Sequence, residues 1–164
     1  MTRINLIPPQ ALTDQHCFAE WREIKMIPRA LNRSLKAIKA SADMGNYDRL
    51  LDKIPLDFTL NKGHVMFFYN KGEYLLKRYT LLTESLMRRG FNINPQTPLD
   101  PEGVYDSLPK FYFWQDYEPT PEALKIIRER LHESFWKQPQ WYRYSEPAAF
   151  WASESPYGER NVLA

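Results

Sequence analysis

Two positions near the start of the chain have the residue types that amine catalysis needs. Once Met1 is removed, Thr2 presents a primary α-amine, whose ordinary pKa of about 7.7–8.0 lies well below that of a lysine. A neutral amine can attack an electrophilic sugar carbon and form an imine. The carboxylate of Glu23 can give acid–base help in that reaction. The small side chain of Thr2 permits removal of Met1, so the sequence indicates an enzyme whose nucleophile is its N-terminal amine.

Positive charge accompanies these two positions. Arg3 and Arg22 are their sequence neighbours, and nearby cations favour the neutral, nucleophilic form of an amine. Residues 1–40 hold seven Lys or Arg against three acids, whereas residues 91–122 hold one Lys against six acids. A chain that is basic at one end can approach a polyanion in one orientation. The charge pattern therefore favours nucleic acid as a partner.

A run of cations has helical spacing. Its members are Arg22, Lys25, Arg29, Arg33 and Lys36. Residues three or four apart share one face of a helix, so the run predicts a basic stripe. A stripe of this kind is either a DNA-binding surface or a solvated charged face, and the spacing leaves both open.

A first long helix is expected to position these residues. It is capped by Thr13 or Asp14 and spans Gln15–Lys39. Pro28 lacks the amide that would bond the carbonyl of Ile24, so a kink is expected there.

Two further long helices are expected. One spans Gly63–Arg89 and ends at Gly90, and the other begins after the Thr120 cap and Pro121 and runs through Lys137. The expected core positions on these helices are Val65, Phe68, Leu75, Leu76, Tyr79, Leu82, Leu86, Leu124, Ile127, Leu131 and Phe135. Arg88 and Arg89 can either favour the helix dipole or contact phosphates.

The rest of the chain is expected to be loop. The connector 40–62 has a helical turn around Tyr47–Leu51, and Asn92–Pro119 is rich in Pro and Asp. No segment alternates with period two. The predicted class is all-α, with a single compact domain of about three main helices and long connecting loops.

The composition of the chain argues against metalloproteins, disulfide-bonded proteins and membrane proteins. One cysteine and three scattered histidines argue against a disulfide or a metal site, so no metal is expected. The start lacks a signal-peptide pattern, and no apolar run is long enough to span a bilayer. We expect a monomeric, cytoplasmic protein of bacterial or viral origin that acts on chromosomal DNA.

Several blocks of the sequence resemble the pyrimidine dimer DNA glycosylases, the family of phage endonuclease V. They are Met1–Leu6, Asp14–His16, Ala19–Glu23, Gly63–Tyr69, Arg89–Ile93, Arg130–Leu131 and Pro139–Tyr144. These blocks lie in the family's order and reach across most of residues 1–144.

The resemblance implies a base-excision repair enzyme with two activities, DNA glycosylase and apurinic/apyrimidinic lyase. The α-amine of Thr2 is expected to attack the deoxyribose C1′ of the 5′ nucleotide of a cyclobutane pyrimidine dimer. Glu23 is expected to assist base release and then removal of the 2′ proton, so that β-elimination cuts the strand. No cofactor is implied, and the partner is double-stranded DNA with a damaged base.

The resemblance also implies the DNA-binding residues. Arg3, Arg22 and Arg29 match cations that grip phosphates, Arg29 only after an insertion of three residues before Pro28. Gln15 and His16 match the DNA interface. The remaining positions are Arg130 and the aromatic–basic cluster Trp141, Tyr142, Arg143 and Tyr144, expected near the lesion. Each assignment has a structural alternative. The aromatic rings of the cluster could only pack against the helices, His16 could be structural, and Glu23 could be a helix carboxylate without a catalytic role.

The chain departs from the phage pattern in three places. They are the insertion before Pro28, a longer connector within 41–54, and an extension beyond Tyr144. We expect a glycosylase-like domain over residues 1–144 and a loosely ordered extension over residues 145–164. These departures leave two alternatives open, a glycosylase/lyase for another damaged or modified base and a catalytically silent DNA-binding module.

Overall fold

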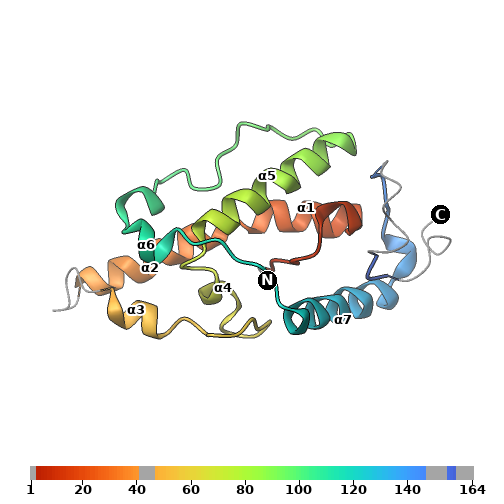
Figure 1. Cartoon of the computed structure of the whole chain (residues 1–164). Helices are drawn as coiled ribbons and strands as arrows, with labels where there is room; N and C mark the ends of the chain where they lie inside the picture. The colour runs from red at the N-terminus through yellow and green to blue at the C-terminus, as the bar shows by residue number, and fades with distance from the viewer. Residues whose placement is uncertain (1–2, 41–46, 147–154, 158–164) are drawn as a thin grey trace. The chain divides into compact units, whose positions relative to one another are not determined.

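Helices account for all the regular structure that is described. The computed structural model describes residues 3–40, 47–146 and 155–157, and within these ranges there is no strand, which confirms the all-α class. The helices are α1 (Asp14–Glu23), α2 (Met26–Ala40), α3 (Asp48–Asp52), α4 (His64–Phe67), α5 (Gly72–Arg88), α6 (Lys110–Phe113), α7 (Pro121–Lys137) and the 3₁₀ helices η1 (Pro9–Ala11), η2 (Tyr105–Ser107) and η3 (Pro139–Trp141) (Figure 1). None of the helices in these ranges has the length and apolar character that crossing a membrane requires.

The chain packs into two compact units. The described part of unit 1 is Arg3, Glu23–Arg78 and Pro98–Glu118, and unit 2 contains Ile4–Arg22, Tyr79–Thr97 and the described residues from Pro119 onward. Helix α5 runs from one unit into the other, and α1 ends at the boundary.

The predicted single helix Gln15–Lys39 is wrong, because the structure has two helices separated by a turn at residues 24 and 25. Pro28 is the third residue of α2, and proline is tolerated in a first turn, where an amide has no intrahelical partner. The carbonyl of Ile24 accepts a hydrogen bond from the amide of Ile27 instead, at 3.1 Å. The expected kink is therefore a complete break four residues earlier. The predicted cap at Thr13 is confirmed, since its hydroxyl accepts from the amide of His16.

The predicted helix Gly63–Arg89 is also interrupted. Residues 68–71 separate α4 from α5, and Lys71 pairs with Trp114 in an isolated antiparallel bridge. The predicted end at Gly90 is confirmed. Gly90 has φ +85°, and the amide of Phe91 donates to the carbonyl of Leu86 at 3.0 Å, which is the Schellman arrangement.

The third predicted helix is confirmed at both ends. Helix α7 spans Pro121–Lys137, and the hydroxyl of Thr120 accepts from the amide of Ala123. Ile127, Leu131 and Phe135 are fully buried, as predicted. The predicted turn near residues 47–51 is α3.

The core of each unit contains the apolar positions of its helices. In unit 1, α2 packs against α4, and α3 and α4 lie below α2 in Figure 1. Phe67 and Phe68 meet edge to face with ring centroids 5.0 Å apart. In unit 2, Tyr79, Leu82 and Leu86 are buried. Leu76 was predicted in the core but is 44% exposed, because it is one residue past the buried stripe of α5, about 100° around the helix.

Candidate functional site

The segment that follows Arg3 is held firmly in unit 2. Ile4, Asn5, Leu6 and Ile7 are all buried. The backbone amide of Asn5 donates to Oε1 of Glu20 at 3.0 Å. Leu6 has φ +61°, and the amide of Ile7 bonds the carbonyl of Asn5 at 2.6 Å, the i to i+2 bond of a γ-turn. A non-glycine residue in this region is strained and persists only where its surroundings fix it, so the start of the segment is well defined.

The hydrogen bond between Asn5 and Glu20, called the Asn5–Glu20 anchor below, fixes the chain close to its N-terminus. Thr2 lies outside the described residues, and two residues, Arg3 and Ile4, stand between it and Asn5, so these three residue steps span about 10 Å at most. Glu23 follows Glu20 by one turn of the continuous helix α1, about 4.5 Å along the axis. The hydrogen bond thus places the segment that follows Arg3 beside the helix that carries Glu23.

The predicted cations near the N-terminus have different surroundings. Arg22 is exposed, and its guanidinium lies 5.8 Å from the ring centre of Phe18. Arg29 is exposed on α2, whereas Arg3 and Glu23 are half-buried in unit 1. The predicted five-residue stripe is not one helix face, because Arg22 is on α1 and Lys25 is in the turn. Arg29, Arg33 and Lys36 remain as exposed residues that share α2.

Gln15 fixes the segment that holds the aromatic–basic cluster. Its side-chain amide donates to the carbonyl of Trp141 at 2.7 Å, and its side-chain oxygen accepts from the amide of Arg143 at 2.9 Å. The amide nitrogen and the amide oxygen of the Gln15 side chain are therefore both hydrogen-bonded to the backbone of the cluster. Its predicted contact with DNA stays a prediction.

His16 lies within a group of aromatic rings. Its Nδ1 is 2.7 Å from the hydroxyl of Tyr157 and 3.0 Å from Oγ1 of Thr13. Its ring stacks on Tyr157 with an interplanar angle of 9° and lies 4.7 Å from the ring of Tyr142. These contacts support the alternative that His16 is structural, and its predicted contact with DNA stays a prediction.

The aromatic–basic cluster is unevenly exposed. Trp141 is 58% exposed, whereas Tyr142 is half-buried and bonded to Ser134 at 3.1 Å. Arg143 is exposed, and Tyr144 donates to the carbonyl of Gln10. The structure thus brings four of the predicted residues, Gln15, His16, Trp141 and Tyr142, together in unit 2. Arg130, also in unit 2, is half-buried on α7.

A buried polar network joins three distant segments of unit 2. Arg89 donates to Oδ1 of Asp14 and to the carbonyl of Pro9, both at 2.8 Å. Glu146 accepts from Ser85 at 2.7 Å and lies 3.7 Å from Arg89. Burial raises the pKa of Glu146, but hydrogen bonds from Arg88 and Ser85 outweigh that effect and hold the pKa below its usual value. The Arg89 guanidinium is therefore bonded within the fold, which favours a structural role over a contact with phosphates.

Some residues of the site were missed from the sequence. Glu20 and Tyr157 were given no role, and each is almost fully buried. Glu20 had a signal, because it lies between Cys17 and Ile24, both buried, at the three- and four-residue spacing of one helix face. Tyr157 had none, since its hydrogen-bond partners, Thr13 and His16, are more than 140 residues away. It belongs to the extension predicted to be loosely ordered. Residues 147–154 and 158–164 of that extension lie outside the described residues.

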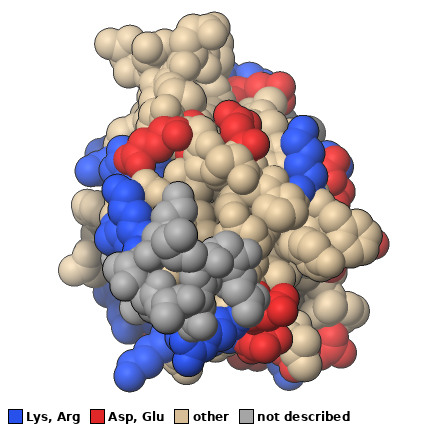
Figure 2. Space-filling model, turned by 90° about the vertical axis from the view of Figure 1, so that its left-hand side faces the viewer, with Lys and Arg blue, Asp and Glu red and all other residues tan. Residues whose placement is uncertain are grey.

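Unit 1 contains a pocket, and the face in Figure 2 carries both signs of charge. On the face that Figure 2 presents, Lys and Arg are most frequent along the left and lower left, and Asp and Glu near the top and right. A pocket of about 340 Å³ in this unit is lined by Ser34, Ala37, Ile38, Arg49, Leu50, Lys53 and Met66, none of which was predicted in the site. Within the described ranges, no group of three or more His, Cys, Asp or Glu is placed to hold a metal ion.

Comparison with known families defines the class of the protein. The profile of the pyrimidine dimer DNA glycosylases matches residues 1–99, more than half of the 164 residues. The matched part includes Thr2, Glu23 and the Asn5–Glu20 anchor. The protein is thus a DNA glycosylase, an enzyme whose substrate is DNA. Specifically, the chain belongs to the pyrimidine dimer DNA glycosylase family.

Proposed function

We propose that the protein removes a base at cyclobutane pyrimidine dimers through an imine formed by the α-amine of Thr2, and then cuts the strand as a lyase. The observation that carries the proposal is the hydrogen bond from Asn5 to Glu20. It ties the segment that begins at Ile4 to the helix that ends at Glu23, which supports a reaction in which the amine and the carboxylate act together. The family match covers both residues.

The first step is a displacement at the sugar. After Met1 is removed, the neutral amine of Thr2 attacks C1′ of the deoxyribose, and the C1′–N bond to the base breaks. The displaced base keeps the bonding electrons, takes up a proton and stays joined to the neighbouring pyrimidine through the cyclobutane ring. Opening of the sugar ring and loss of the amine protons give the imine. The carboxylate of Glu23 stabilises positive charge that develops on the sugar.

The second step is β-elimination. The imine makes the C2′ proton acidic, and Glu23 acts as the base that removes it. The electrons form a C2′–C3′ double bond, and the C3′–O bond breaks to release the 3′ phosphate. Hydrolysis of the imine then frees the enzyme.

DNA recognition rests on charge, stacking and deformation. Arg22 and Arg29 are exposed and suit phosphate contacts, while the exposed ring of Trp141 suits base stacking. DNA that contains a dimer is already weakened, so bending it costs less than bending intact duplex.

Borohydride trapping tests the proposal. Incubation with duplex that contains a pyrimidine dimer should give a covalent protein–DNA complex, and acetylation of Thr2 should abolish it. Glu23→Gln should keep DNA binding but lose turnover. Glu84→Gln, on an exposed residue of α5, is the matched control and should keep both.

The other outcomes identify the alternatives. Trapping on a different lesion of a small panel would assign another damaged base. Binding without any trapped complex would assign a silent DNA-binding module. Full activity with a blocked N-terminus would rule out the amine mechanism.

A further inference from the structure

The extension beyond Tyr144 supplies a buried residue to the aromatic cluster. Tyr157 is 1% exposed, and its hydroxyl accepts from the amide of Thr13 at 3.2 Å. The same hydroxyl is bonded to Nδ1 of His16. The Thr13 amide is at the start of α1, so Tyr157 satisfies a helix-end donor that has no intrahelical partner. This part of the chain lies beyond the family match over residues 1–99.

Ring contacts lead from Tyr157 to the exposed Trp141. Tyr157 stacks on His16 at a centroid distance of 5.6 Å. The His16 ring contacts Tyr142, and Tyr142 meets Trp141 edge to face at 5.1 Å. Phe135 of α7 contacts both Tyr157, at 5.2 Å, and Tyr142, at 5.4 Å. The rings between Tyr157 and Trp141 are thus packed on more than one side.

The backbone of the cluster is fixed separately. Gln15 bonds the backbone of Trp141 and Arg143. Asp14 accepts from both the amide and the hydroxyl of Ser145, at 2.9 and 2.6 Å. These bonds set the path of the chain, but they do not set the tilt of the rings. From the extension, the Tyr157 ring contacts His16 directly, and His16 in turn contacts Tyr142.

We propose that Tyr157 is a positioning residue for DNA binding, which acts through His16 and Tyr142 to hold the Trp141 ring in the orientation that stacks on a base. This proposal rests on the proposed function, because it takes Trp141 as a DNA contact. A side chain that is already ordered loses less entropy when it binds. Tyr157 therefore lowers the dissociation constant without touching DNA or the reacting atoms.

A double-mutant cycle in equilibrium binding tests the proposal. The probe is a labelled duplex with one cyclobutane pyrimidine dimer, and the variants are Tyr157→Phe, Trp141→Ala and the pair. Tyr157→Phe keeps the ring but loses the hydroxyl bonds, and should raise the dissociation constant about 3-fold. Trp141→Ala should raise it about 5- to 100-fold, as loss of a stacking ring does. In the Trp141→Ala background, Tyr157→Phe should change it by less than about 1.5-fold.

Controls separate positioning from folding. Tyr112→Phe, on a half-exposed tyrosine of unit 1, should leave binding unchanged. The rate of trapping at saturating DNA should stay within about 2-fold for Tyr157→Phe, because the chemistry is at Thr2. Additive effects of the two substitutions, or unchanged binding by Tyr157→Phe, would overturn the proposal. The binding cycle needs no trapping, so absence of a trapped complex with wild-type protein would count against the proposed function alone.

Discussion

The amide of Asn5 and the carboxylate of Glu20 form a hydrogen bond of 3.0 Å between two buried residues. It joins the segment behind the N-terminal amine to the helix that carries Glu23. A buried amide that loses its acceptor costs free energy, since no water replaces it. The bond therefore links the stability of the fold to the placement of the proposed nucleophile.

Glu20→Ala should lower both stability and catalysis. We expect the free energy of unfolding to fall by about 1–3 kcal/mol, because the Asn5 amide is left buried without this acceptor. Thermal unfolding measures the first effect, and single-turnover trapping at saturating DNA measures the second. Glu20→Gln keeps an acceptor oxygen and should lose less of both. Equal trapping rates for wild type and Glu20→Ala would show that the anchor does not position the amine.

Arg29→Ala should reduce the dependence of DNA binding on salt. The guanidinium is exposed on α2, and each phosphate contact that is lost should make the slope of log K against log salt less steep by about 0.9. The measurement is a titration of binding over several salt concentrations. Lys77→Ala is the control, because Lys77 is bonded to Asp116 at 2.7 Å, and its slope should match wild type. An unchanged slope for Arg29→Ala would remove it from the interface.

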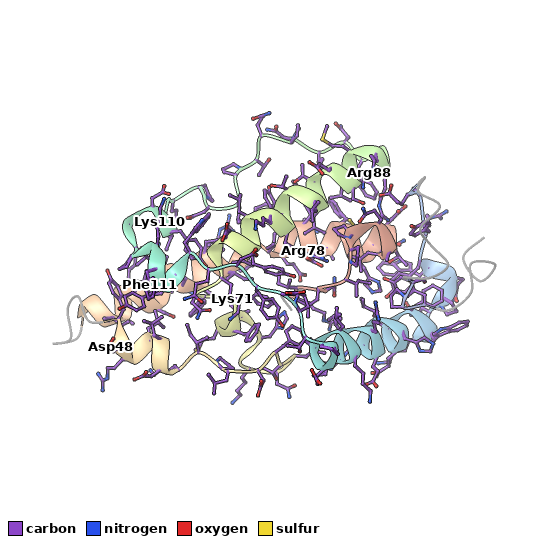
Figure 3. The ribbon with its side chains drawn as sticks, in the orientation of Figure 1. Asp48, Lys71, Arg78, Arg88, Lys110 and Phe111 are labelled. Carbon is purple, nitrogen blue, oxygen red and sulfur yellow. The ribbon has the colours of Figure 1, made fainter. Side chains whose placement is uncertain are left out.

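Lys71 should make stability rise at alkaline pH. Burial lowers the pKa of its ammonium group to about 8, and its Nζ lies 3.7 Å from the ring centre of Phe67, near the start of α5 (Figure 3). The unfolded chain keeps this proton up to its ordinary pKa of about 10.4. Between about pH 8 and that value the unfolded state binds more protons, so stability rises with pH.

A comparison with Lys71→Met isolates this effect. Denaturant unfolding from pH 7 to 10.5 should show a gain on the order of 1 kcal/mol for wild type relative to the variant, after allowance for solvent screening. Lys77→Met is the control, since the hydrogen bond to Asp116 raises the pKa of Lys77, and its profile up to pH 10.5 should differ little from that of wild type. A Lys71→Met profile parallel to that of wild type would contradict the lowered pKa.

Local signals in the sequence predicted the ends of helices well. The Thr120 cap, the Thr13 cap and the Gly90 end each depend on one residue and its immediate neighbours. The sequence predicted a kink at Pro28 within one helix, whereas the structure has a break between α1 and α2, because a proline has opposite effects in a helix interior and in a first turn. Sequence alone does not show which of the two applies until the helix start is known.

The candidate site was predictable only in part, for a related reason. Residue types and the family resemblance singled out Thr2, Glu23 and Trp141. The bonds that organise these elements, such as Glu20 with Asn5 and Tyr157 with His16, join residues 15 and 141 positions apart. Pairing over such separations leaves no periodic pattern, so only the folded chain reveals it.

Arg88 and Arg89 provide a final, matched comparison, because they are adjacent at the end of α5 and only one is buried. The Arg89 side chain has no exposed surface and bonds Asp14, whereas the Arg88 side chain is 43% exposed. Arg89→Ala leaves the buried Asp14 without its cation and should cost about 3–5 kcal/mol. Arg88→Ala should cost less, because the buried Glu146 keeps its hydrogen bond from Ser85 and its pairing with Arg89.

Both effects are measured by denaturant unfolding, with DNA binding as a second measurement. Because Arg89 is used within the fold, Arg89→Ala should leave the salt slope of DNA binding unchanged in the fraction that folds. A less steep slope would mean that Arg89 reaches phosphates after all. Similar losses of stability for the two variants would mean that the Asp14–Arg89 pair is not the buried link between α1 and α5 that its geometry indicates.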